Sequence, residues 1–414
     1  MLKLVALVLL ATMARADRLA DGIVEWVRSN DGFFSDKLEI RRMDPSDASS
    51  PFGVFAKERI DAKERLMDVP RGCYIEVWDE AKDMNIDGME ESLNAYHENL
   101  CMLSHKLRKE MELGKDSEFA PYIAYLETQK SGQLPAMWSK AGKDLLRKVL
   151  VPGSDGVDWM DRYYKKTGCI GDDPFEEHIM EMILQRCYDT ALIPIWDMVN
   201  HDNGRINTEN DSQYAEGGIK VRASKSIEAD EEIYATYDKC VDCFDIADYW
   251  GTPEILRDFG FVERYPQRWV FLDREIWFEI WEKPGELEIV WDIGEPGDDV
   301  YGMPNEEGIR FLREELQRLQ KVGKDDLMEQ GVVPKNEWDV ILQFHEAAET
   351  AMSMAIGSAL TGRKDDELWW HHVCLGTEDP GIFVDSAGRY RLHHARHGHD
   401  SLIQNTHLGR HAVF

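Results

Sequence analysis

Two stretches of the chain carry side chains whose types and spacing could do chemistry. Asn200 and His201 close an apolar run that begins at Leu192. A polar pair at the end of such a run must find hydrogen-bond partners, so it indicates a strand or turn that meets a polar cavity. Further along, residues 232–238 alternate with a period of two, which predicts a half-buried strand. That strand would deliver the hydroxyl of Tyr237 to the Asn-His pair.

Each of these residues also has a purely structural interpretation. His201 could be a core histidine, Tyr237 a strand aromatic with a satisfied hydroxyl, and Asn200 a cap at a strand end. Their occurrence together and in this order favours a functional site over three separate structural roles.

A helix that starts at Asp173 and Pro174 positions a further candidate, Arg186. A capping aspartate followed by proline is a typical helix start. The predicted apolar face consists of Phe175, Ile179, Met182 and Ile183. With about 100° of rotation per residue, Arg186 falls on the same face. A guanidinium aimed into the interior needs an anion, and a salt bridge with Asp189 or Asp197 would supply one.

The composition narrows the classes of partner. The chain has 414 residues, of which 43% are hydrophobic, so it can bury a sizeable core. Its 79 acidic residues outnumber 48 basic ones, which argues against direct binding of nucleic acid. This acidity suits a basic protein or peptide substrate, and it equally suits a merely solvated surface.

The first 16 residues have the features of a cleavable secretory signal: one lysine, a short apolar core, and Ala14-x-Ala16 before Asp17. A buried N-terminal strand or helix is the alternative. We expect no membrane span, because no other apolar run approaches the spanning length. Seven cysteines are too few for a disulfide scaffold but allow one or two bridges.

Three blocks of the sequence share their order and pattern with a known family. They read Asp197-Met-Val-Asn200-His201, Glu231-Glu-Ile-Tyr-Ala-Thr-Tyr237-Asp238 and Pro253-Glu-Ile-Leu-Arg-Asp-Phe-Gly-Phe-Val-Glu263. They resemble the SET-domain protein methyltransferases, in particular the branch that includes the plant Rubisco large-subunit lysine methyltransferase.

The resemblance implies an α+β fold. It consists of a SET-domain β-clip of small sheets over residues 17–265, a helical insertion at about 79–187, and a mostly helical C-terminal substrate-binding domain over 266–362. A histidine-rich tail would follow over 363–414. The residues themselves predict a strand at 286–293 and two C-terminal helices, one carrying Ile309, Leu312, Leu316 and Leu319, the other running from Trp338 to Ile356.

The resemblance also assigns roles. Tyr237 would be the catalytic residue that orients the reacting groups. The residues that would bind S-adenosylmethionine are Phe52, Gly53, Arg186, Asn200 and His201. The residues on the substrate side would be Asp197, Tyr214 and Phe259. The reaction would be in-line displacement of a methyl group from the sulfonium to a neutral lysine amine, with no metal required.

Three positions depart from the pattern of the family. Pro51 stands where the cofactor loop has a glycine, and proline removes a backbone donor. Phe259 stands where a tyrosine is usual, which removes a hydroxyl from the acceptor channel. Cys240-Val-Asp-Cys243 lies between the last two blocks; it could be a local disulfide, two free thiols or half of a zinc site.

These departures keep two alternatives open: a protein-histidine methyltransferase, and a SET-fold module that binds peptides without turnover. We expect a monomer. The N-terminus predicts the secretory pathway, or a plastid reached through the endomembrane system. The tail holds the cluster His393-His-Ala-Arg-His-Gly-His399, which could take a metal but favours a solvated segment.

Overall fold

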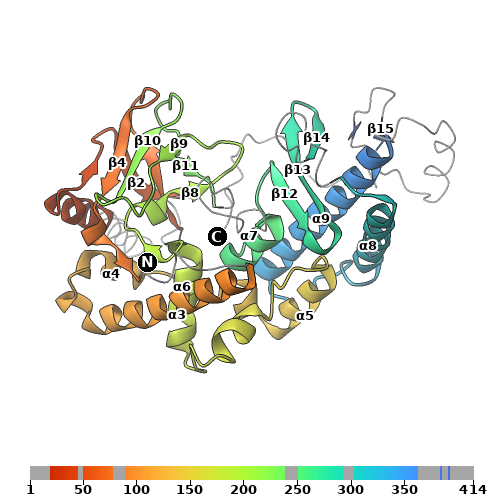
Figure 1. Ribbon diagram of the computed structural model, residues 1–414, viewed down its shortest axis with the longest axis horizontal. Helices are drawn as coiled ribbons and strands as arrows, with labels where there is room; N and C mark the ends of the chain where they lie inside the picture. Colours follow the sequence, from red (N-terminus) through yellow and green to blue (C-terminus); the bar gives the residue numbers. More distant parts are fainter. Residues whose placement is uncertain are drawn as a thin grey trace, which may run out of the picture.

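The computed structural model describes residues 19–44, 50–77, 89–237, 250–291 and 303–361, and two short strands further on, β15 (Phe383–Val384) and β16 (Tyr390–Arg391). Figure 1 shows small sheets on the left and a helical unit with its own sheet on the right, with α6 and α7 between them. Each side has a separate hydrophobic core. The predicted α+β class is confirmed.

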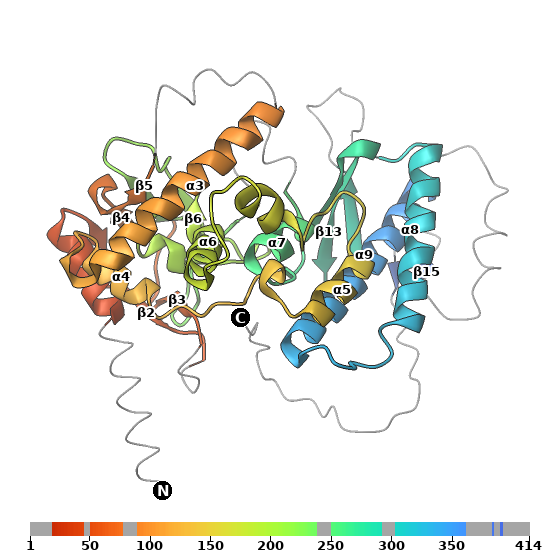
Figure 2. The same ribbon diagram turned by 90° about the horizontal axis from the view of Figure 1, so that it is seen from below.

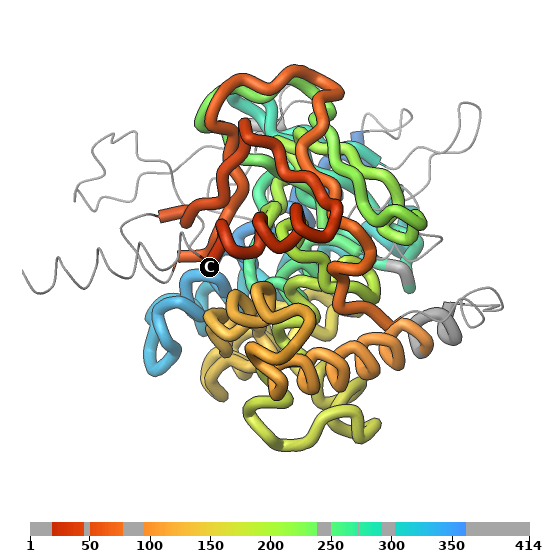
Figure 3. The backbone as a smooth tube through the Cα atoms, turned by 90° about the vertical axis from the view of Figure 1, so that its left-hand side faces the viewer, coloured from red at the N-terminus to blue at the C-terminus, as the bar shows by residue number. Residues whose placement is uncertain are grey.

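Strands from before and after the predicted insertion pair with each other. In the four-stranded sheet, β4 (Arg65–Val69) lies between β1 (Phe33–Phe34) and β10 (Ile219–Ala223), and β9 (Thr208–Asn210) forms the far edge. In β10 buried and exposed residues alternate, because one face packs on the core. Figure 3 shows these red and green segments together, above the insertion helices. The insertion therefore leaves the β-sheet unit intact.

The other small sheets complete this unit. They are built from β2 (Leu38–Arg42) with β3 (Phe52–Ala56), from β5 (Ile75–Glu76), β7 (Ala191–Leu192) and β6 (Cys187–Tyr188), and from β8 (Asn200–His201) with β11 (Tyr234–Ala235). A helix over residues 19–29 buries Ala20, Ile23 and Val27 on the first core. Although β3 and β4 follow one another in the sequence, they pair with other strands and not with each other.

Helices fill the predicted insertion. They are α3 (Met89–Leu113), α4 (Ala120–Leu126), α5 (Lys140–Val149), the π-helical turn η4 (Asp161–Lys165) and α6 (Pro174–Arg186). As predicted, α6 starts with Pro174 after Asp173, whose side chain accepts from the amide of Phe175. Its buried face holds Ile179, Met182 and Ile183. The placement of Phe175 on that face is wrong: the residue is 39% exposed, because the first turn of α6 faces solvent.

The C-terminal unit combines a sheet with two long helices. The sheet consists of β12 (Gln267–Phe271), β13 (Ile276–Lys283) and β14 (Glu286–Trp291), and the helices are α8 (Glu306–Asp325) and α9 (Lys335–Thr361). The strand and both helices expected here are confirmed. Figure 2 shows α5 lying along α9, and Leu145, Leu146 and Val149 of α5 belong to the second core. Part of the predicted insertion thus packs with the C-terminal unit.

Between the two units, α7 (Thr252–Phe259) ends at Gly260, whose φ is 79°. A Cβ atom at Gly260 would lie 2.4 Å from the carbonyl oxygen of Gln133, so only glycine fits. Among the described residues no helix is both long and apolar enough to cross a membrane.

Candidate active site

The short parallel pairing of β8 with β11 brings the two chemistry-bearing stretches together. Tyr234 lies opposite Asn200, and Ala235 lies opposite His201. The strand predicted over 232–238 is therefore shorter than expected, and the half-buried pattern is wrong, since the four residues from 232 to 235 are all buried. Asn207 covers this segment in place of a neighbouring strand. Its side chain donates to the carbonyl of Glu232 and accepts from the amide of Tyr234.

Tyr237 comes two residues after this strand. Its hydroxyl donates to the carbonyl oxygen of Val199 at 2.9 Å, which fixes the phenol beside the start of β8. The ring centroid lies 5.2 Å from that of His201 and 4.6 Å from that of Phe259. Burial raises the pKa of Tyr237, so the phenol is protonated at neutral pH and acts as a donor. The structure thus brings three of the predicted site residues into one aromatic cluster.

Both ring nitrogens of His201 bind protein groups. The backbone amide of Tyr237 donates to Nδ1 at 3.0 Å, so the proton sits on Nε2, which lies 3.0 Å from Oε2 of Glu263. The other carboxylate oxygen of Glu263 accepts from the hydroxyl of Thr252 at the start of α7. The side chain of His201 is 2% exposed. The buried imidazole therefore positions Tyr237 and, through Glu263, links it to α7.

Asn200 has a buried partner that sequence reasoning missed. Its amide nitrogen donates to Oε1 of Glu232 at 2.7 Å and lies 3.4 Å from the carbonyl of Phe52. A Cβ atom at Gly53 would lie 2.8 Å from the same carboxylate oxygen. The structure thus gathers Phe52, Gly53 and Asn200 around Glu232, and burial raises the pKa of that carboxyl group. The sequence signal for Glu232 was an acidic residue in an otherwise apolar segment.

Arg186 forms the second polar group of the site. Its Nη1 lies 3.2 Å from Oδ2 of Asp197 and donates to the hydroxyl of Tyr125 at 2.8 Å, while Nη2 donates to Gln129. Of the two carboxylates considered from the sequence, the structure selects Asp197. Tyr122 donates to the same Oδ2 at 3.0 Å. Tyr122, Tyr125 and Gln129, from α4 and the residues after it, were not predicted as site residues.

This ion pair is deeply buried. The Asp197 side chain is 1% exposed and the Arg186 side chain 15%. Burial raises the pKa of Asp197 to about 6, against the lowering effect of Arg186. Two of its atoms, Nε of Arg186 and Oδ1 of Asp197, are buried without a hydrogen-bond partner among the described residues. Such atoms are rare in folded proteins and are expected to find a partner when a polar ligand binds.

An edge-to-face contact joins the polar group around Glu232 to the one around Arg186, because the ring of Phe52 lies 5.8 Å from that of Tyr125.

Tyr214 lies in a different setting: its hydroxyl donates to Asp189 at 3.2 Å, and Asp189 also accepts from Gln213. Its predicted place on the substrate side stays a prediction. Cys240, Cys243, the predicted signal over 1–16 and the tail cluster over 393–399 lie outside the described residues.

A search of curated proteins finds no match. Solved structures with a similar chain path include "Structure of Rubisco LSMT bound to AdoMet", at 10% identity and a TM-score of 0.47, covering 83% of this chain and 92% of that one. Another is "Crystal structure of the SET domain of LSMT bound to Lysine and AdoHcy", at 10% identity and a TM-score of 0.45, covering 83% and 91%. The family model of the SET domain matches residues 51–238, the segment that contains β3, β8, β11 and Tyr237. This match places a SET domain within the chain.

Proposed function

We propose that the chain transfers a methyl group from S-adenosylmethionine to a lysine side chain of a protein substrate. The observation that carries this proposal is the anchored phenol of Tyr237, held by the carbonyl of Val199 at the end of the β8 and β11 pair of a SET domain. A protonated hydroxyl fixed by packing and by a hydrogen bond is preorganised to orient reacting groups.

The residues present fit the polar part of the cofactor. S-adenosylmethionine carries a carboxylate and an ammonium group at one end. Arg186, with its unpartnered Nε, would hold the carboxylate, and the buried carboxylate of Glu232 beside Asn200 suits the ammonium. Because Glu232 binds the amide nitrogen of Asn200, the amide oxygen is left to accept from a ligand. The absence of a side chain at Gly53 lets the Glu232 carboxylate lie against the backbone there, since a Cβ atom would be 2.8 Å from its Oε1.

When bound, the cofactor supplies an electrophilic methyl group on its sulfonium. The lysine amine of the substrate must lose its proton before it can attack this methyl group. A lysine amine ordinarily has a pKa near 10.4, and apolar surroundings lower it. The rings of Tyr237 and Phe259, with centroids 4.6 Å apart, form such a surface. The amine loses its proton to solvent before transfer, and the hydroxyl of Tyr237 then orients it for in-line attack.

We also propose a basic protein substrate and a protein that enters the secretory pathway. The acidic composition supports the first, at 79 acidic against 48 basic residues. The disulfide between Cys101 and Cys169 supports the second, because such bonds persist mainly in oxidising compartments.

The function is tested by product analysis. Residues 17–414 are incubated with methyl-labelled S-adenosylmethionine and a set of basic proteins, and the labelled products are hydrolysed to amino acids. We expect labelled methyllysine. Labelled methylhistidine would support the alternative acceptor, and no label from a folded protein across the set would contradict the proposal and favour a peptide-binding module.

A further inference from the structure

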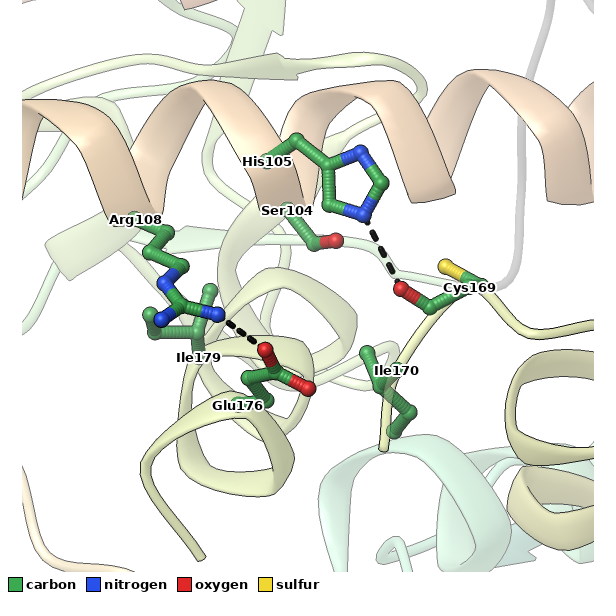
Figure 4. A pocket seen from close by; sticks show the side chains of 7 residues that line it. All are labelled: Ser104, His105, Arg108, Cys169, Ile170, Glu176 and Ile179. Atoms are coloured by element: carbon green, nitrogen blue, oxygen red, sulfur yellow. Dashed lines mark hydrogen bonds and ion pairs between the residues drawn. The ribbon is translucent and has the colours of Figure 1, made fainter. Parts of the chain in front are cut away.

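Three metal-ligating side chains meet where α3 passes the segment that leads into α6. Cys101 and His105 lie one turn apart on α3, so they share a face of the helix. Cys169 approaches from the segment between η4 and α6. Each residue offers one ligand atom, and these three atoms lie within 4.8 Å of one another. Figure 4 shows His105 pointing from α3 toward Cys169.

In the structure the two sulfurs form a disulfide, with 5.6 Å between the Cα atoms. The ring of His105 stays beside it, because Nε2 lies 2.9 Å from the carbonyl oxygen of Cys169. A disulfide sulfur is a poor metal ligand, whereas a thiolate is a strong one. The same three residues can therefore have two chemically distinct states.

We propose that Cys101, His105 and Cys169 form a binding site for a thiophilic divalent cation of the zinc class when the disulfide is reduced. Two thiolates and an imidazole are a ligand set that such cations prefer, and ligands at about 2.0–2.3 Å from one ion lie within about 4 Å of each other. Small rotations of the side chains bring the three atoms from their present separation to that spacing. Water takes the fourth position of the tetrahedron.

The interconversion is a thiol-disulfide exchange followed by metal binding. A dithiol reductant gives two electrons to the bond between Cys101 and Cys169 and is itself oxidised to a disulfide, leaving two thiols. The divalent cation then displaces two protons, one from each thiol, and binds both sulfurs and the neutral imidazole of His105.

Neighbouring contacts keep the ligands close when the disulfide is open. The hydroxyl of Ser104 donates to the carbonyl of Cys101. Further along α3, Arg108 pairs with Glu176 of α6 (Figure 4). The two helices thus remain in contact without the covalent bond. Either the disulfide or the metal would tie α3 to the segment before α6, the helix that ends at Arg186.

The test is a cobalt titration followed by thiolate-to-cobalt charge-transfer absorption. The full chain carries Cys240→Ser and Cys243→Ser, which remove the other closely spaced cysteine pair. We expect the dithiol-reduced protein to bind one equivalent of cobalt with thiolate absorption, and the oxidised protein to show none. Both samples are the same protein, so the comparison does not depend on a difference in folding between variants.

Two further variants assign the ligands. Cys169→Ser should abolish the thiolate absorption while leaving any binding by the histidine-rich tail. His105→Ala should weaken cobalt affinity by at least about tenfold. The proposal is overturned if the reduced protein, with an unchanged circular dichroism spectrum, gives no stoichiometric thiolate absorption, or if Cys169→Ser gives the same absorption as its parent.

Discussion

Replacing Tyr237 with phenylalanine is expected to lower the rate of methyl transfer by about 10²-fold, the loss typical of misplacing reacting groups that a fixed side chain orients. The substitution deletes only the hydroxyl that donates to the carbonyl of Val199. The ring keeps its neighbours His201 and Phe259, at centroid distances of 5.2 and 4.6 Å. Affinity for the cofactor should change little, so the loss should appear in kcat. Initial rates with labelled cofactor measure it.

Tyr163→Phe is the matched control, because it removes a tyrosine hydroxyl from η4, which contributes no residue to the aromatic cluster of the site. We expect it to keep the wild-type rate. If Tyr237→Phe retained the wild-type kcat, or if both variants lost it equally, the catalytic role of the Tyr237 hydroxyl would be wrong.

Replacing Asp197 with alanine is expected to cost about 3–5 kcal/mol in the free energy of unfolding, the range observed when one partner of a buried ion pair is removed. The guanidinium of Arg186 would keep Tyr125 and Gln129 but lose the carboxylate with which it pairs, and Tyr122 would lose its acceptor. Because the carboxylate is 1% exposed, water cannot easily replace it. Urea unfolding followed by circular dichroism measures the loss.

Asp144→Ala on α5 is the control for this variant. Asp144 pairs with Lys140 and Arg147, but its side chain is 49% exposed. Exposed pairs contribute at most about 1 kcal/mol, because water and salt screen them. Equal losses for Asp144→Ala and Asp197→Ala would mean that the Arg186–Asp197 pair is not desolvated, contrary to the structure.

Local patterns predicted much of this molecule. A capping aspartate, a proline and apolar spacing located α6, and the same reasoning located the strand β14 and the helices α8 and α9. These elements depend on contacts near in sequence, which the spacing of residues encodes directly. The family blocks then identified Asn200, His201 and Tyr237, which the β8 and β11 pairing brings together.

Such local patterns could not predict contacts between residues that are distant in the sequence. His201 binds Glu263, 62 positions away. The choice of Asp197 over Asp189 as the partner of Arg186 depends on where the fold places η5 (Trp196–Met198), which carries Asp197. Cys169 is bridged to Cys101 across 68 positions, a pairing that seven cysteines leave undetermined. Long-range pairing depends on the tertiary packing of both partners, whereas helix and strand periodicity depends on neighbours in sequence.

The measurement that tests the central claim most directly is calorimetric titration of residues 17–414 with S-adenosylmethionine, beside Asn200→Ala. We predict that the wild-type protein binds one cofactor per chain with micromolar affinity. The variant should bind at least tenfold more weakly, because the substitution leaves Glu232 without its amide partner. A folded wild-type protein that binds no cofactor would contradict the account.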